Sequence, residues 1–227
     1  VVRNPPTITD YRRITKQVQI EKIETFFVDR YLVVRITTDD GTQGIGESCY
    51  WSYPKAAEQT ILGFADALIG MGPGDIEHIW SYLWRYNSAF RSNSIGGAVS
   101  AIDMALWDLY AKRVNQPLYQ VLGGLSRDRI RVYNTCAGYS YGVKKKGGWK
   151  AGQIDYQPEQ PYEDLQGFMT DAGELADDLL SQGFTAMKIW PFDGYSNDTN
   201  GQFISATELD EGTEPFRKIR EKVGNRM

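Results

Sequence analysis

The sequence has few of the residues that build disulfide frameworks and metal centres. Among 227 residues there are two cysteines, Cys49 and Cys136, and one histidine, His78. Two cysteines so far apart exclude a disulfide scaffold and a cysteine-rich zinc site. A single histidine, predicted to lie on the outer face of its helix, cannot by itself form a His-rich metal centre. The scarcity of cysteine and the lack of secretory-signal features predict a cytoplasmic location.

Charge of one sign and long apolar runs are also lacking. The 25 Lys and Arg residues against 29 Asp and Glu residues give a net charge of -4, which does not favour nucleic acid or an anionic membrane as a partner. The most apolar stretch, residues 61–71, contains Asp66 and is much shorter than the roughly 20 residues of a membrane-spanning helix. The glycines at positions 41, 44 and 46 lack the spacing of a nucleotide-binding loop.

The first half of the chain predicts an antiparallel sheet followed by helices. Alternating and β-branched residues predict strands over 18–27, 31–38 and 42–48, with a turn at residues 39–41. From Pro54 the apolar spacing becomes helical, and residues 98–114 carry a bulky stripe beside three alanines that allow close packing. The second helix is expected to bury five side chains: Ile76, Ile79, Trp80, Leu83 and Trp84. This half therefore reads as an α+β unit.

The second half follows a βαβα order. Strands are predicted at 129–135 and 185–190, and helices at 162–182 and 213–223. Two parallel strands leave apolar surface open, so such a unit belongs to a larger open sheet or an eight-stranded barrel. We therefore expect the chain to end inside its second domain. The long connections 137–161, which is rich in lysine, and 193–211 are interpreted either as lids over a site or as solvated excursions.

Three ionisable residues stand out on these elements. Lys188 lies near the end of an apolar strand, where an ammonium group needs a carboxylate partner or an open cleft. We interpret it as a base or an electrostatic clamp. Asp103 and Asp108, five residues apart on one helix, do not share a face, and capping or pairing between domains is their expected role.

Four ordered segments resemble the enolase superfamily, and more narrowly its mandelate racemase and muconate lactonizing enzyme branch, which includes sugar-acid dehydratases. They are Glu47 after Gly44-Ile45-Gly46, the run AIDMALWD at 101–108, PLYQVLGG at 117–124 and RIRVY at 129–133. The resemblance covers residues 18–227. It implies an N-terminal extension (1–17), an α+β capping domain (18–125) and the first βα units of a (β/α)8 TIM-like barrel (126–227), with the chain truncated within the barrel.

The resemblance also implies a chemistry, the Mg2+-assisted removal of a proton α to a carboxylate. Family members take their metal ligands from the third, fourth and fifth barrel strands, so the expected ligands lie beyond residue 227 and no residue here is assigned to metal. Many relatives have Lys-x-Lys at the end of the second barrel strand, and this chain has Lys188-Ile189-Trp190. The missing second lysine counts against a lysine-based racemase.

We therefore expect Lys188 to be catalytic, holding the substrate carboxylate or the departing oxygen. The expected substrate-binding residues are Tyr50, Trp51, Arg91, Asn134, Tyr139 and Trp190. The predicted function is dehydration of a sugar acid, a small carboxylate-bearing substrate, by a homo-oligomer, with this segment alone inactive. The alternatives are a racemase, epimerase or cycloisomerase of the same branch, and a non-catalytic scaffold.

Overall fold

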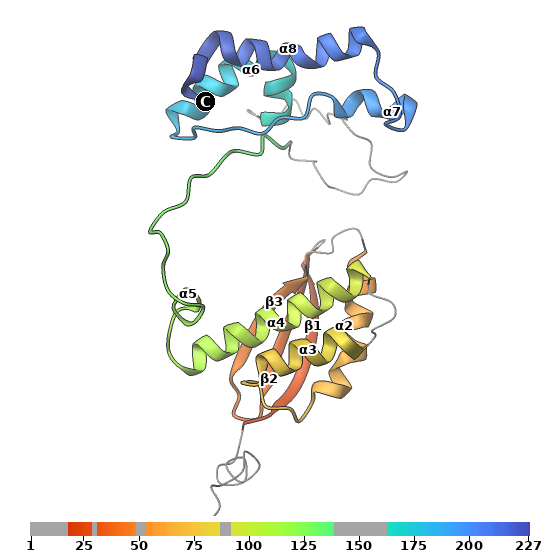
Figure 1. Ribbon diagram of the computed structural model, residues 1–227, viewed down its shortest axis with the longest axis vertical. Helices are drawn as coiled ribbons and strands as arrows, with labels where there is room; N and C mark the ends of the chain where they lie inside the picture. The colour runs from red at the N-terminus through yellow and green to blue at the C-terminus, as the bar shows by residue number, and fades with distance from the viewer. Residues whose placement is uncertain (1–17, 29–30, 49–52, 87–91, 139–162) are drawn as a thin grey trace, which may run out of the picture. The chain divides into compact units, whose positions relative to one another are not determined.

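The computed structural model describes residues 18–28, 31–48, 53–86, 92–138 and 163–227. The chain divides into two compact units, Val1–Ser126 and Arg127–Met227 (Figure 1). Within the described ranges, no helix is long and apolar enough to cross a bilayer.

The described residues of the first unit open with a three-stranded antiparallel sheet. The strands β1 (Ile20–Val28), β2 (Tyr31–Thr38) and β3 (Gln43–Ser48) follow one another in sheet order. In the register, Val34 of β2 lies opposite Thr25 of β1 and Gly46 of β3. Every second side chain of β2 from Leu32 onward is buried, so one face of the central strand supplies the core. The predicted meander is confirmed.

The described part of this unit also holds four helices: α2 (Pro54–Leu68), α3 (Ile76–Tyr86), α4 (Asn93–Arg113) and the short α5 (Leu118–Val121). Figure 1 shows α2, α3 and α4 on one face of the sheet. Helix α4 lies directly on β3, because Gly44 and Gly46 present no side chain to it. A Cβ atom built on Gly46 would lie 2.0 Å from the carbonyl oxygen of Ala101, and one on Gly44 the same distance from that of Ala105. The two glycines therefore allow the backbones of β3 and α4 to approach closely.

Helix α4 also covers the outer edge of the sheet. The Asp108 carboxylate accepts a hydrogen bond from the backbone N–H of Ile45 at 2.8 Å. The Lys112 ammonium bonds both the Gln43 carbonyl, at 3.0 Å, and Asp108, at 2.7 Å. Because β3 is an edge strand, these side chains satisfy backbone groups that would otherwise be available to another strand. Asp108 thus has a structural role in capping.

Helix α3 buries fewer side chains than the sequence predicts. Ile76, Ile79 and Leu83 are buried as expected, but Trp80 is 40% exposed and stacks on the half-buried Trp84, with ring centroids 5.5 Å apart. The prediction that Trp80 is buried is wrong. Three aliphatic residues already fill the stripe that packs into the core beside α4, so the indoles pack on each other at its margin. His78 is exposed, as predicted.

The second unit has a core formed mainly by two helices. They are α6 (Asp164–Ser181) and α8 (Ala206–Val223), with η1 (Asp193–Tyr195), α7 (Ser196–Thr199) and η2 (Gly224–Arg226) as short additions. Buried side chains of α6, including Phe168 and Leu179, pack with Ile219 and Val223 of α8. The predicted strands appear as two extended segments joined by one parallel bridge between Asn134 and Met187. Parallel pairing is confirmed, but the pairing is shorter than predicted.

Helix α8 begins seven residues before the predicted residue 213. Ser205 accepts a hydrogen bond from the N–H of Glu208 at 3.2 Å, and the Glu208 carboxylate accepts one from the N–H of Ser205 at 2.7 Å. This reciprocal capping box fixes the start of the helix. Pro215 lies inside both the predicted and the observed helix, so it does not set where the helix begins.

Candidate functional site

The candidate site lies where the two parallel segments of the second unit run side by side. The N–H of Asn134 donates to the carbonyl of Ala186 at 3.1 Å, and the N–H of Lys188 donates to the carbonyl of Asn134 at 2.8 Å. These two bonds place Asn134 next to Lys188, although they are far apart in sequence. Polar side chains at the carboxyl ends of neighbouring parallel strands are where α/β enzymes build their sites.

Lys188 is exposed and lies beside an aromatic ring. Its Nζ atom is 5.5 Å from the centroid of the Trp190 ring. Among the residues that the structure describes, no carboxylate forms an ion pair with Lys188. In the described part of the chain Lys188 is thus an exposed cation beside an indole ring, and its catalytic role stays a prediction.

Trp190 is held against the helix layer. Its ring meets that of Phe168, on α6, edge to face with centroids 5.7 Å apart, and Phe168 is 1% exposed. Trp190 itself is half-buried at the margin of the α6–α8 core. The Trp190 ring thus contacts the core through Phe168 and also contacts the exposed Lys188.

The Asn134 side chain is used inside the chain. Its Oδ1 atom accepts a hydrogen bond from the N–H of Cys136 at 2.7 Å, and the side chain also hydrogen-bonds Asp164. This turn lets Cys136 adopt a left-handed backbone conformation, with φ of 41°. Substrate binding by Asn134 stays a prediction, and it would require these bonds to be shared or exchanged.

Asp164 and Cys136, which both hydrogen-bond the Asn134 side chain, were not predicted as site residues. Burial raises the pKa of Asp164, and the nearby negative charge of Asp178 acts in the same direction, while the hydrogen bond from Asn134 opposes both. Burial, aided by the charge of Asp164, raises the pKa of Cys136 to about 12. The Cys136 thiol is fully buried, so it stays neutral and unreactive near neutral pH. The only indication for Asp164 in the sequence was its position at the start of a helix that follows a long connection.

Four predicted substrate-binding residues, Tyr50, Trp51, Arg91 and Tyr139, lie outside the described residues. The same holds for the lysine-rich run at 144–150. Lys188, Asn134 and Trp190 are therefore the predicted site residues that the structure brings together.

The described residues do not form a magnesium site. In the described part of the chain, no three His, Cys, Asp or Glu side chains come together in a way that could hold a metal ion. Asp164 is half-buried and has a protein hydrogen-bond donor and a raised pKa, which fits a structural carboxyl better than a ligand of a hard cation.

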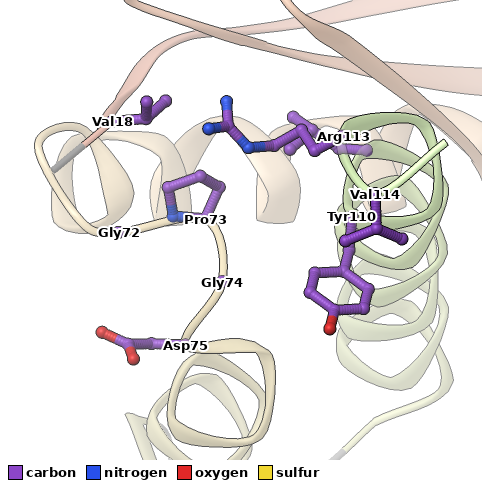
Figure 2. Close-up of a pocket in the computed structure, with 9 residues that line it drawn as sticks. Val18, Gly72, Pro73, Gly74, Asp75, Tyr110, Arg113 and Val114 are labelled. Carbon is purple, nitrogen blue, oxygen red and sulfur yellow. The ribbon is translucent and has the colours of Figure 1, made fainter. Parts of the chain in front are cut away.

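A cavity of about 390 Å³ lies in the first unit, far along the sequence from Lys188. The Gly72–Asp75 turn and the end of α4 form its walls, and the Arg113 side chain extends across it toward Val18 and Pro73 (Figure 2). Arg113 also forms an ion pair with Asp40. Its guanidinium group is thus already paired within the chain, and the cavity has no feature of a catalytic centre.

Fold and sequence together define the family. The family model of the mandelate racemase / muconate lactonizing enzyme N-terminal domain matches residues 8–123. The chain belongs to this family, a branch of the enolase superfamily, and the first unit is its capping domain. The expected fold class is confirmed.

The relatives are named as sugar-acid dehydratases and enolases. The chain is 40% identical over 113 residues to the D-galactonate dehydratase family member RspA of Halomonas elongata, an alignment that takes in 48% of this chain and 27% of the relative. The D-mannonate dehydratase of Novosphingobium aromaticivorans matches with the same identity, length and coverage. The crystal structure of an enolase protein from Sargasso Sea environmental sequencing superposes with a TM-score of 0.71 at 35% identity, covering 92% of this chain and 49% of that one. The chain therefore spans about half the length of this solved structure.

Proposed function

We propose that the whole protein dehydrates a sugar acid. In this reaction a base removes the proton on the carbon next to the carboxylate, and the hydroxyl group on the following carbon leaves as water. The electrons of the broken C–H bond form a carbon–carbon double bond, and the resulting enol becomes a 2-keto acid. The atoms balance with loss of one water molecule, and no oxidant or reductant is needed.

The observation that carries the proposal is the position of Lys188. Its ammonium group is exposed at the end of a parallel segment, and in the described part of the chain no carboxylate pairs with it. A cation in this position suits the carboxylate of a sugar acid or the departing hydroxyl oxygen. The names of the relatives support the same substrate class.

Trp190 supports dehydration over lysine-based racemisation. An indole cannot remove a proton from carbon, so in our proposal the base comes from a part of the protein outside the described residues. We further propose that Mg2+ stabilises the enediolate in the whole protein, held by residues other than those described here. A cytoplasmic location and a homo-oligomeric assembly stay predictions.

The proposal is tested by assaying the whole protein against a panel of aldonates and aldarates, with 2-keto acid formation as the readout. We expect turnover of at least one acid sugar and a large loss in Lys188→Ala. The matched control is Lys222→Ala, on α8, whose ammonium group pairs with Glu174 of α6. Equal activity in Lys188→Ala and the wild type would remove Lys188 from the site.

The other readings give different results in the same assay. Exchange of the α proton with solvent deuterium, without loss of water, would support a racemase or epimerase instead. Absence of both exchange and dehydration across the panel would support a non-catalytic scaffold. The segment 1–227 by itself is predicted to be inactive.

A further inference from the structure

We propose that Trp190 is a positioning residue, which holds the Lys188 ammonium group in place to receive an anionic group of the substrate. The inference rests on the proposed function for its consequence in catalysis. The contact between Lys188 and the Trp190 ring is observed in the structure and does not depend on the proposed function. It gives Trp190 a role that acts through Lys188, distinct from the direct substrate contact expected from the sequence.

The first step in the argument is that the lysine backbone is fixed. The N–H of Lys188 bonds the carbonyl of Asn134 at 2.8 Å, within the parallel bridge. Asn134 is itself held by its side-chain bonds to the N–H of Cys136 and to Asp164. The point from which the lysine side chain leaves the chain is therefore set by several hydrogen bonds.

The second step is that the indole ring is fixed too. Phe168, which is 1% exposed, meets the Trp190 ring edge to face at 5.7 Å, with an angle of 67° between the ring planes. Such aromatic pairs hold their geometry through the charge distribution of the rings. The Trp190 ring therefore presents a defined surface to the lysine.

The third step concerns the ammonium group. A lysine side chain has four flexible bonds and loses up to about 2 kcal/mol of rotamer freedom when it is held in one place. At 5.5 Å from the ring centroid, the Lys188 Nζ atom lies within the range of a cation–π contact, which does not require a hydrogen bond from the ammonium group. A carboxylate partner would hold the lysine as well, but it would also neutralise its charge. The indole restricts the lysine and leaves its charge available to a substrate.

The experiment compares Trp190→Leu with Trp190→Phe in the whole protein. Leucine removes the aromatic ring, whereas phenylalanine keeps one. Ile189→Val is the matched control, because Ile189 packs against the same core on the adjacent position. The first readout is the NMR chemical shift of the Lys188 ε-methylene protons, which an adjacent ring displaces. The second readout is kcat and KM for the acid sugar that the wild type dehydrates.

We expect the Lys188 signal to move to the value of a free lysine in Trp190→Leu and to stay displaced in Trp190→Phe and Ile189→Val. We expect KM to rise about 2- to 5-fold in Trp190→Leu, the equivalent of about 0.5–1 kcal/mol for an exposed cation–π contact, and to be largely restored by phenylalanine. An unchanged Lys188 signal in Trp190→Leu, or equal KM values in all the variants, overturns the inference.

The two proposals fail in different ways. If the wild type dehydrates no acid sugar, the proposed function fails, and the NMR comparison still decides whether Trp190 holds Lys188. If the Trp190→Leu protein does not fold, Trp190→Phe decides the question through the same signal. A Lys188 signal at the free-lysine value in the wild type would also overturn the inference.

Discussion

Replacing Gly46 with alanine tests how tightly α4 packs on the sheet. The added Cβ atom would lie 2.0 Å from the carbonyl oxygen of Ala101 and 2.9 Å from the backbone nitrogen of Ala105. Ordinary contacts begin at 3.4 Å, so the helix and β3 must separate by about 1.4 Å at this point. Both obstructing atoms belong to the helix backbone, and no rotamer change can relieve the contact.

The expected cost follows from that rigidity. Overpacking a well-packed core usually costs about 1–3 kcal/mol, and a backbone contact belongs at the upper end of this range. With a urea dependence of about 1–3 kcal/mol per molar, a loss of about 3 kcal/mol lowers the unfolding midpoint by about 1 M or more. We expect this shift in urea unfolding followed by far-UV circular dichroism, together with faster amide hydrogen exchange in peptides from β3 and α4.

The matched control is the same substitution at Gly63. This glycine lies inside α2, is exposed, and has no atom within 4 Å of its added Cβ atom. Alanine there is expected to stabilise the unit by about 0.5–1 kcal/mol, since glycine is the poorer helix former. Wild-type stability in Gly46→Ala would refute the packing argument, and so would equal destabilisation by the two variants.

Three further predictions concern single side chains. Asp108→Ala should destabilise the first unit by about 1 kcal/mol and speed hydrogen exchange at the Ile45 amide, and Asp108→Asn should partly restore both. Exchange at the wild-type rate in Asp108→Ala would contradict the edge-capping role. Hydrogen bonds from Thr38, from the Thr42 backbone and from Arg113 lower the pKa of Asp40. The ionised Asp40 carboxylate should therefore stabilise the folded protein above about pH 4, and this stabilisation should be lost as the pH falls. Urea midpoints measured from pH 7 down to pH 2 should therefore fall less steeply in Asp40→Asn than in the wild type, and parallel curves would count against this. At pH 8 a thiol with a pKa of about 12 is ionised in roughly one molecule in ten thousand. Peptide mapping after iodoacetamide treatment should therefore find Cys136 unmodified in the native protein and modified in urea. Rapid labelling of the native protein would show instead that the thiol is accessible.

Local patterns in the sequence were enough to predict much of the first unit. Alternation sets the three strands, because each strand buries one face, and helical spacing sets the buried face of α4. A glycine inside a strand indicates either a bulge or a close approach of backbones, and the fold shows that Gly44 and Gly46 serve a close approach. The pair Ser205 and Glu208 has the spacing of a capping box, which is a local signal for the start of α8 that the prediction of a helix from residue 213 missed.

The tertiary structure decided which side chains meet. Nothing local to Asp108 says that it accepts a hydrogen bond from Ile45, and nothing local to Trp80 says that aliphatic neighbours already fill the space beside it. The same holds at the candidate site, where the sequence singled out Lys188 and Trp190, and the fold added the anchor Phe168. Periodicity is a property of neighbours along the chain, so it fixes which face of an element is apolar. Contacts between elements depend on where distant segments pack, and only the folded chain determines that.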